Sequence, residues 1–285
     1  MLGSPVAHSL SPVLHAAAYQ ALGLAGWAYE AIECDEARLP GLLDSLGPEW
    51  AGLSLTMPLK RAVIPLLDQA EQLVSHVGAA NTVVFGPAGR AGYNTDVPGM
   101  ITALAEAGVS AAPDSVLVLG AGATACSALA ALRGLGVPRV TVAVRSQASA
   151  GQLLQVAGRV GVQVRLAEFG TAGGAAGPGG TEGAADTGAE AGRWQLLIST
   201  VPAGAADQYA ALIDGGDLTA ATVLDVVYHP WPTRLAQAAG RAGAAVAGGL
   251  ELLLHQAARQ VELMTGRDAP VAAMRQAGQA ALADR

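Results

Sequence analysis

The sequence predicts an α/β protein of two domains, and two observations lead to that prediction. Short apolar segments rich in β-branched residues alternate with alanine- and leucine-rich helical segments along most of the chain. A glycine turn, Gly120-Ala121-Gly122, follows one of the strand-like segments and opens a helix-like one. Such alternation predicts a parallel sheet with right-handed crossovers. The 285 residues are enough for two domains.

Residues 1–99 are expected to form an α/β substrate-binding domain. Ser11 as N-cap and Pro12 at the first helical position predict a helix that continues to Leu22. The next expected elements are a strand at 27–34, a helix at 39–46, a strand at 52–56, a helix starting at 57–60, and strands at 81–85 and 91–94 around a turn at 86–89. The amphipathic C-terminal helix, 250–285, is expected to pack back on this domain.

Residues 100–249 are expected to form a doubly wound parallel-sheet domain. A connecting helix is predicted at 97–107, a buried strand at 115–119 with its helix at 123–135, and further strands at 139–144, 162–166, 196–199 and 223–227. The segment 170–192 is rich in Gly, Ala and Thr, so it has too little apolar surface to offset its ordering entropy. We therefore expect a flexible surface loop there.

Composition argues against several classes of protein. The net charge of −7 gives no basic footprint for nucleic acid. Cys34 and Cys126 show no metal-ligand spacing, so no metal site is expected and a reducing cytoplasm fits. The uncharged stretch 115–132 has nearly the length of a membrane span, but the glycine turn interrupts it. No signal peptide is visible at the N-terminus. The expected partner is a small-molecule substrate. The sequence leaves open whether the protein forms a homodimer.

The glycine turn predicts dinucleotide binding in a Rossmann-type domain. Gly120 permits the tight turn, and Gly122 lets the backbone approach a pyrophosphate at the helix N-terminus. Ala125 takes the third, close-packing position of the motif. A plain tight turn is the alternative, but the strand–turn–helix context favours the cofactor.

The end of the second strand in this domain indicates which cofactor binds. An NAD site usually has an acid there for the ribose, whereas this strand ends Val144-Arg145-Ser146. A guanidinium suits a 2′-phosphate, so NADP is expected. Arg145 as a solvated loop charge is the alternative, and no second basic residue follows soon after it.

Lys60 and Asp96 stand in small polar islands of an apolar sequence. A lysine in the first turn of a helix is disfavoured by the helix dipole, which makes a functional role plausible for Lys60. The alternatives are a surface lysine, an Asp96 that caps the following helix, and an Asn81 that only forms a turn. Together the three residues predict proton chemistry beside a nicotinamide.

Hydroxyl groups supply further candidates for the site. Ser9 and Ser11, two residues apart before a helix, can bind one carboxylate, although Ser11 can also cap that helix. Tyr228 follows a buried strand, and the C-terminal ends of parallel strands line the ligand crevice. Tyr228 is therefore a candidate active-site hydroxyl.

Taken together, the motifs resemble the shikimate dehydrogenase family over essentially the whole chain. They occur in order as 3–12, 56–60, 78–82, 94–96, the glycine turn, 199–202, 225–228 and 249–256. The resemblance implies reversible NADPH-dependent reduction of 3-dehydroshikimate to shikimate in aromatic amino-acid biosynthesis. It also implies Lys60 and Asp96 as catalytic residues. The implied substrate-binding residues are Ser9, Ser11, Thr56, Lys60, Asn81, Asp96, Tyr228 and Gln256, and the implied cofactor-binding residues are Gly120, Gly122, Ala123, Arg145, Thr200, Val201 and Gly249.

The chain departs from the family pattern at a few positions. Ser54 stands where the family often has Asn, and Val144 where an asparagine is usual before Arg145. Ala123 and Cys126 replace a third adjacent glycine and an arginine, which puts the strength of phosphate binding in doubt. Members commonly have several residues before 3–5, so either the start at Met1 is late or the first strand is short.

Two other functions are weighed against this one. A quinate/shikimate dehydrogenase that uses NAD is the nearest rival, and Arg145 argues against it. A non-catalytic regulator that binds a dinucleotide or metabolite on the same scaffold is the second. The presence of both Lys60 and Asp96 disfavours that reading.

Overall fold

The computed structural model describes residues 1–171 and 192–285, so all but the ends of the loop expected at 170–192 lie outside the described residues. The chain divides into two compact units. The first comprises Met1–Gly99 and Leu253–Arg285, and the second comprises Met100–Leu252. The C-terminal segment thus belongs to the same unit as the N-terminal one. The single helix expected at 250–285 is wrong, because two helices, α10 (Gly249–Thr265) and α11 (Val271–Ala283), are separated by residues 266–270.

The second unit contains a six-stranded sheet in which every pair of neighbours is parallel. Its order is β12 (Ala245–Ala247), β11 (Thr219–Asp225), β10 (Arg193–Ser199), β7 (Val116–Leu119), β8 (Arg139–Val144) and β9 (Gln163–Glu168). The chain runs outward from β7 to β9, returns to β10 on the other side of β7, and runs outward again. This is the doubly wound order that binds dinucleotides, so the fold prediction is confirmed.

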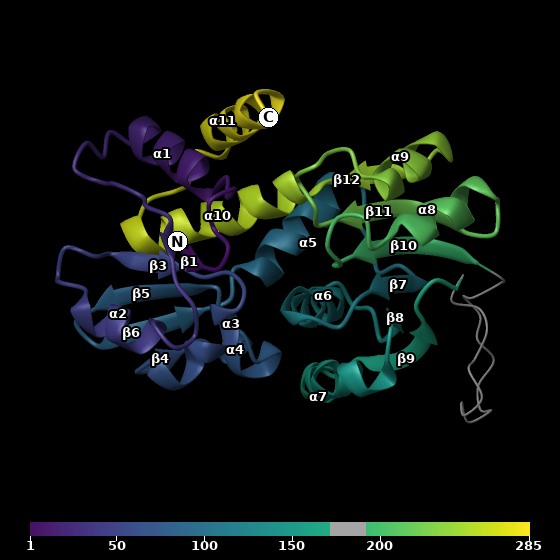
Figure 1. Ribbon diagram of the computed structural model, residues 1–285, viewed down its shortest axis with the longest axis horizontal. Coiled ribbons are helices and arrows are strands. Elements are labelled where there is room, and N and C mark those ends of the chain that lie inside the picture. Colours follow the sequence, from purple (N-terminus) through teal and green to yellow (C-terminus); the bar gives the residue numbers. More distant parts are fainter. Residues whose placement is uncertain (172–191) are drawn as a thin grey trace. The chain divides into compact units, whose positions relative to one another are not determined.

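Helices cover both faces of this sheet. Figure 1 shows α6 (Ala123–Gly134) and α7 (Gly151–Val160) on one side, with α8 (Asp207–Asp214) and α9 (Arg234–Arg241) on the other. All four residues of β7 are buried, as two covered faces require. Leu117, Leu197 and Val223 share one core cluster with Tyr209 of α8 and Leu235 of α9, because alternate strand residues face the same side. A short 3₁₀ turn, η2 (Gln147–Ala150), precedes α7.

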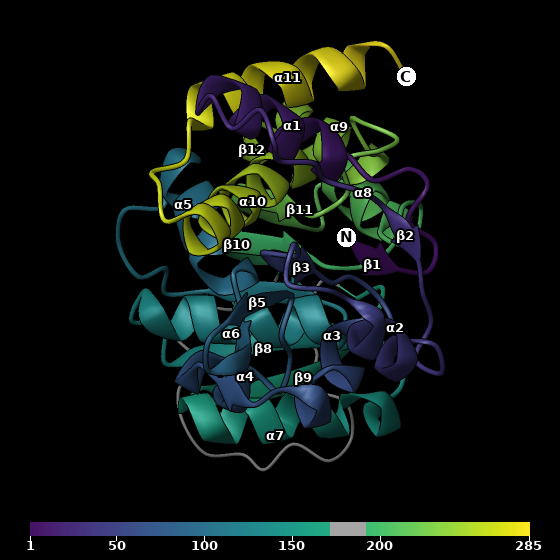
Figure 2. The ribbon, with the colours of Figure 1, turned by 90° about the vertical axis from the view of Figure 1, so that its left-hand side faces the viewer.

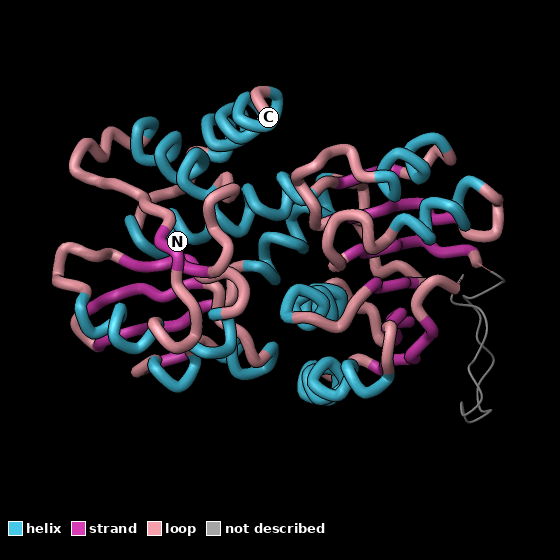
Figure 3. The backbone as a smooth tube through the Cα atoms, viewed as in Figure 1, coloured by secondary structure: helices cyan, strands magenta, loops and turns pink. Residues whose placement is uncertain are grey.

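The first unit is built on a mixed sheet (Figure 3). Its four strands lie in the order β3 (Gly52–Ser54), β5 (Thr82–Gly86), β6 (Gly89–Tyr93) and β4 (Gln69–Ala70), antiparallel except for β4 with β6. A parallel pair, β1 (Leu2–Gly3) and β2 (Ile32–Glu33), joins it through a bridge from Leu2 to Leu55. The strand expected at 27–34 is limited to β2, because its partner β1 has only two residues.

The helices of the first unit fall into two groups. α1 (Ser11–Ala21) and α11 (Val271–Ala283) lie side by side in Figure 2 and pack with the part of α10 (Gly249–Thr265) that follows Leu252. α2 (Leu39–Ser45), α3 (Leu59–Ala62) and α4 (Gln72–Val77), with the 3₁₀ turn η1 (Ile64–Leu66), complete the group near the sheet. α5 (Asp96–Glu106) starts in this unit. The expected N-cap at Ser11 is wrong by one residue: Leu10 occupies that position and Ser11 begins the helix.

The described part of the chain lacks two kinds of feature. No helix there has the length and apolar character needed to cross a membrane. No group of three or more His, Cys, Asp or Glu side chains among those residues is arranged to hold a metal ion.

Candidate active site

Lys60 and Asp96 form a close ion pair in the first unit. Lys60 is the second residue of α3, and its carbonyl accepts a 2.7 Å hydrogen bond from Ala80 N, which ties α3 to the segment before β5. Its Nζ lies 2.6 Å from Asp96 Oδ2. The two side chains are only 16% and 9% exposed. An ion pair so far removed from water interacts more strongly than a surface pair.

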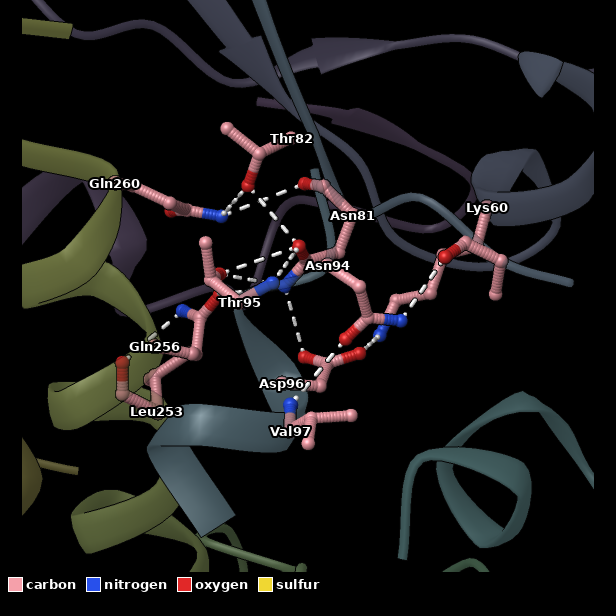
Figure 4. A network of polar contacts seen from close by, with 11 residues as sticks. Lys60, Asn81, Thr82, Asn94, Thr95, Asp96, Val97, Leu253, Gln256 and Gln260 are labelled. Carbon is pink, nitrogen blue, oxygen red and sulfur yellow. Dashed lines mark hydrogen bonds and ion pairs between the residues drawn. The ribbon is translucent and has the colours of Figure 1, made fainter. Parts of the chain in front are cut away.

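Asn81 is the centre of the hydrogen-bond network around this pair (Figure 4). Its Nδ2 donates to Asp96 Oδ1 and Thr95 Oγ1, both at 2.9 Å, and lies 3.2 Å from Gln256 Oε1. Its Oδ1 accepts from Thr95 N at 2.7 Å and from Thr82 Oγ1 at 3.0 Å. Because both ends of the buried amide are engaged, Asn81 is more than a turn residue.

Asp96 begins α5, where a negative charge is favoured by the helix dipole. The side chain that caps the start of α5 nevertheless belongs to another residue. Asn94 Oδ1 accepts from Val97 N at 3.2 Å, and Asn94 Nδ2 donates to Ala79 O at 2.9 Å. The carboxylate of Asp96 is therefore left to Lys60 and Asn81, and the alternative that Asp96 merely caps the helix loses its support.

Gln256 comes to this network from the other end of the chain, on α10. Its Nε2 donates to Leu253 O at 3.0 Å, and its Oε1 faces Asn81. Gln260, one helical turn further on, donates from Nε2 to Thr82 Oγ1 at 3.0 Å. Sequence reasoning missed Thr82, Thr95 and Gln260. The i, i+4 spacing of the two glutamines was the available signal, since such residues share a helix face.

Ser9, Ser11 and Thr56, also predicted to bind substrate, lie in the same unit. Ser9 Oγ accepts a 3.1 Å hydrogen bond from Ser11 N, and the Ser11 side chain is almost fully buried. Thr56 follows β3. Its backbone N donates to Leu2 O at 2.9 Å, and its carbonyl oxygen accepts from Leu59 N at 2.8 Å. These bonds hold the Ser9–Ser11 turn and the start of α3 in defined conformations.

The predicted cofactor residues gather in the second unit where the strand order reverses. Gly120 follows β7 with φ of +101°, which favours glycine. A Cβ there would lie 2.9 Å from Thr200 Oγ1 and 3.0 Å from Val201 Cγ1. Thr200 donates from N and from Oγ1 to Leu119 O, at 3.0 and 2.7 Å. The two loops that flank the switch point are thereby joined.

The start of α6 suits an anion. Gly122 occupies the N-cap position, no side chain caps the first turn, and a Cβ at Gly122 would meet no atom within 4 Å. The backbone N–H groups from Ala123 onward are therefore approachable by a phosphate. Arg145 is exposed one residue beyond β8, at the same C-terminal edge of the sheet. These features fit a phosphorylated dinucleotide.

The remaining predicted residues lie around the end of β11. Tyr228 is partly buried in the loop after that strand. Asp225 anchors the loop, because Oδ1 accepts from Val227 N at 3.2 Å and Oδ2 accepts from Thr233 Oγ1 at 2.7 Å. Burial raises the pKa of Asp225. Gly249 begins α10, where a Cβ would stand 2.1 Å from Val226 O, so its lack of a side chain is a packing requirement.

A parallel sheet built for dinucleotides and a separate unit carrying a shielded Lys–Asp pair define a dinucleotide-dependent dehydrogenase. Two segments match known domains: residues 1–83 match the shikimate dehydrogenase substrate binding domain, and residues 249–277 match the shikimate 5′-dehydrogenase C-terminal domain. The shikimate dehydrogenase (NADP+) of Symbiobacterium thermophilum is 37% identical, over 99% of this chain and 93% of that protein. The chain belongs to the shikimate dehydrogenase family.

Solved structures agree with this assignment. The Mycobacterium tuberculosis shikimate dehydrogenase has a TM-score of 0.81 and 42% identity, covering 98% of this chain and 97% of that one. The Thermus thermophilus enzyme, solved with NADP(H) and shikimate, has a TM-score of 0.80 and 32% identity, covering 99% and 98%. The family resemblance inferred from the motifs is thus confirmed.

Proposed function

We propose that this protein is a shikimate dehydrogenase that reversibly reduces 3-dehydroshikimate to shikimate with NADPH. The observation that carries the proposal is the shielded pair in which Lys60 Nζ lies 2.6 Å from Asp96 Oδ2. Of the 16 basic residues, Lys60 alone is a lysine and the rest are arginines. A chain that otherwise uses arginine throughout has a lysine at the one position where a transferable proton is useful.

Lys60 is proposed to manage the charge that develops on the substrate's ring oxygen. When bound, NADPH supplies the hydride for the ketone carbon. The ammonium of Lys60 donates a hydrogen bond to the ketone oxygen, stabilises the negative charge and supplies the proton that makes the hydroxyl. In the opposite direction the amine takes that proton back. An arginine cannot do this at neutral pH, because its guanidinium stays protonated.

Asp96 and Asn81 are proposed to keep the ammonium in place. Asp96 uses Oδ2 for Lys60 and Oδ1 for Asn81, so neither oxygen can swing away without breaking a hydrogen bond. Asn81 is itself fixed from both ends of its amide. Such preorganisation lets the charges act without reorganising during the reaction. Thr56, Tyr228 and Gln256 are proposed to bind the substrate with this group, and Ser9 and Ser11 to bind its carboxylate.

NADP is the proposed cofactor. Arg145 is assigned to the 2′-phosphate on the adenosine ribose of NADP. The pyrophosphate is assigned to the backbone N–H groups of Gly122 and Ala123. Gly120, Thr200 and Val201 are proposed to form the wall of the nicotinamide site, and Gly249 to keep α10 against β11. The support is the reversal of strand order at Gly120, the approachable helix start and the exposed guanidinium. The cytoplasmic location expected from the cysteines stays a prediction.

The test is a matrix of four assays that follow the absorbance of reduced nicotinamide. Purified protein is given shikimate or quinate, each with NADP or NAD. Rapid reduction of NADP with shikimate, and little with the other pairs, is the expected result. Strong activity with quinate and NAD would move the protein to the quinate-oxidising relatives. Cofactor binding without turnover of either substrate would indicate a regulator.

A further inference from the structure

Gln260 contacts Asn81 and its neighbour Thr82 from α10, and the proposed mechanism gives it no task. Its Nε2 donates to Thr82 Oγ1 at 3.0 Å and to Asn81 O at 3.4 Å (Figure 4). The residue is only 1% exposed. It lies one helical turn beyond Gln256 but is not among the residues proposed to bind the substrate. A buried amide so close to the ion pair therefore needs an explanation of its own.

The backbone carbonyl of Asn81 decides which way round the Gln260 amide lies. A carbonyl oxygen only accepts hydrogen bonds, so the group that faces it must be the NH2 of the amide. With the amide turned over, Oε1 would face Asn81 O, and two acceptors would repel each other. In the observed orientation Gln260 Oε1 is buried without a hydrogen-bond partner among the described residues. The amide therefore directs its donors at Asn81 and Thr82 and leaves its own acceptor unsatisfied.

Stability does not explain a glutamine at this position. A buried acceptor without a partner has lost its hydrogen bonds to water and gained none in return, which destabilises the folded state. The two groups that Gln260 contacts have other partners. Asn81 O also accepts from Leu55 N at 2.7 Å, and Thr82 Oγ1 itself donates to Asn81 Oδ1 at 3.0 Å. A methionine of similar length would fill the same space and leave no polar atom unpaired.

Gln260 determines the direction in which the Thr82 hydroxyl donates. A hydroxyl has one proton and can rotate it among nearby acceptors. Because Gln260 Nε2 donates to Thr82 Oγ1, the Thr82 proton is directed away from Gln260 and toward Asn81 Oδ1. The same oxygen accepts from Thr95 N at 2.7 Å. Two donors thus hold the oxygen end of the Asn81 amide, and its Nδ2 faces Asp96 Oδ1 at 2.9 Å.

We propose that Gln260 is a positioning residue that fixes the Asn81 amide and, through it, the carboxylate that holds Lys60. Gln260 donates to Thr82, and Thr82 donates to Asn81. Asn81 in turn donates to Asp96, so every donation runs toward the carboxylate and each one strengthens the next. The inference rests on the proposed function, because it takes Lys60 and Asp96 as the reacting pair.

The first test compares Gln260→Met with Arg259→Met on the same helix. Gln260→Met keeps the length of the side chain and removes its donors. Arg259 is the control, because its exposed guanidinium bonds only to Glu262 on the surface. Gln260→Met is expected to lower kcat for shikimate oxidation about three- to tenfold, the effect of losing one hydrogen bond, with the KM for NADP unchanged and a melting temperature no lower than that of the wild type. Arg259→Met should match the wild type in kcat and in both KM values.

A second test asks whether Gln260 acts through Thr82. An ionised glutamate at position 260 offers only acceptors, so it would draw the Thr82 proton away from Asn81. Gln260→Glu should therefore lower kcat further than Gln260→Met does. Thr82→Val should also lower kcat, and adding Gln260→Met to it should change little, because both substitutions interrupt the same chain of donors. Thr141→Val, on a buried threonine of β8 in the second unit, is the control and should leave kcat unchanged.

Each other outcome would overturn the proposal. An unchanged kcat in Gln260→Met, an equal loss in Arg259→Met, or additive losses from Gln260→Met and Thr82→Val would reduce Gln260 to a packing residue. A Gln260→Met variant that melts at a lower temperature or does not fold would also overturn it, because the glutamine would then serve stability. A wild type inactive on shikimate fails the proposed function itself, whereas an active wild type with a normal kcat in Gln260→Met fails only this inference.

Discussion

Gly99 and Gln256 touch so closely that no side chain fits between them. A Cβ built on Gly99 would stand 2.7 Å from Gln256 N and 3.0 Å from Gln256 Cβ, closer than side-chain atoms approach a neighbouring backbone. Gly99 lies in the first turn of α5, three residues after Asp96. The contact therefore sets how near α10 lies to the start of α5, and with it the reach of the Gln256 amide to Asn81 (3.2 Å).

Gly99→Ala is expected to lower both stability and activity, because α10 must shift away from Asp96. We expect a loss of about 1–3 kcal/mol in unfolding free energy from overpacking. The misplaced Gln256 should lower kcat/KM for shikimate about tenfold, as measured by initial rates on folded protein. Wild-type kinetics at an unchanged melting temperature would show that α10 does not depend on this contact.

Gly158→Ala is the matched control for that substitution. Gly158 lies inside α7, and a Cβ there would meet no atom within 4 Å. The same change should stabilise the protein by up to about 1 kcal/mol, because alanine favours helix over glycine. Urea unfolding of both variants measures the change in unfolding free energy. A decrease for Gly99→Ala and an increase for Gly158→Ala would separate packing at Gly99 from the general effect of adding a methyl group.

Lys60→Ala is expected to lower kcat by about 10²–10⁴-fold with little change in the affinity for shikimate, since general acid–base catalysis contributes that much. Lys60→Arg keeps a positive charge but cannot release a proton, so it should restore little of the lost turnover. Steady-state rates in both directions and shikimate binding by calorimetry would measure this. Unchanged turnover in Lys60→Ala would remove Lys60 from the mechanism.

The strands and helices of the alternating strand–helix pattern were predictable from the sequence. Val116–Leu119, the Gly120 turn and Ala123–Gly134 were all expected within a residue or two, because an apolar run, a glycine turn and an alanine-rich stretch follow one another. The short β4 and β12 were not expected. Two or three residues carry no periodic pattern, and such strands exist because a neighbour offers hydrogen bonds.

Several residues of the candidate site were predictable from the sequence, but few of the hydrogen bonds that join them were. Lys60, Asn81 and Asp96 stood out as polar residues in an apolar sequence, and the structure brings them together. Thr82 did not, and the only signal for Gln260 was its i, i+4 spacing from Gln256. Their role appears only when α10, almost two hundred residues further on, packs beside β5. The spacing of the two glutamines shows that they share a helix face, but nothing in the sequence shows that this face meets Thr82.

Arg145→Ala is expected to raise the KM for NADP and to narrow the gap between NADP and NAD. A charge-assisted contact with a phosphate is worth about 1.5–3 kcal/mol, which corresponds to roughly 10- to 150-fold. Arg139→Ala is the control, because Arg139 is also exposed but begins β8 at the opposite edge of the sheet. If the NADP-to-NAD ratio of kcat/KM is the same in all three proteins, Arg145 does not bind the 2′-phosphate.

His15 should make the stability of the protein depend on pH below neutrality. Its pKa falls from 6.5 to about 3 in the folded chain because the imidazole is completely buried. Between these values the unfolded chain binds a proton that the folded chain refuses, so the unfolding free energy falls as the pH falls. The His15 ring is stacked on that of Tyr29, with centroids 3.9 Å apart, so His15→Phe keeps a ring there and removes the titrating imidazole. From pH 7 to pH 5 the wild type should lose about 2 kcal/mol more than the variant.

Urea unfolding at half-unit steps of pH would measure that difference, with His229→Phe as the control on an exposed imidazole. Parallel curves for wild type and His15→Phe would mean that the folded chain admits a proton to His15. In that case the ring stacked on Tyr29 and bonded to Ser11 O would carry a positive charge in acid.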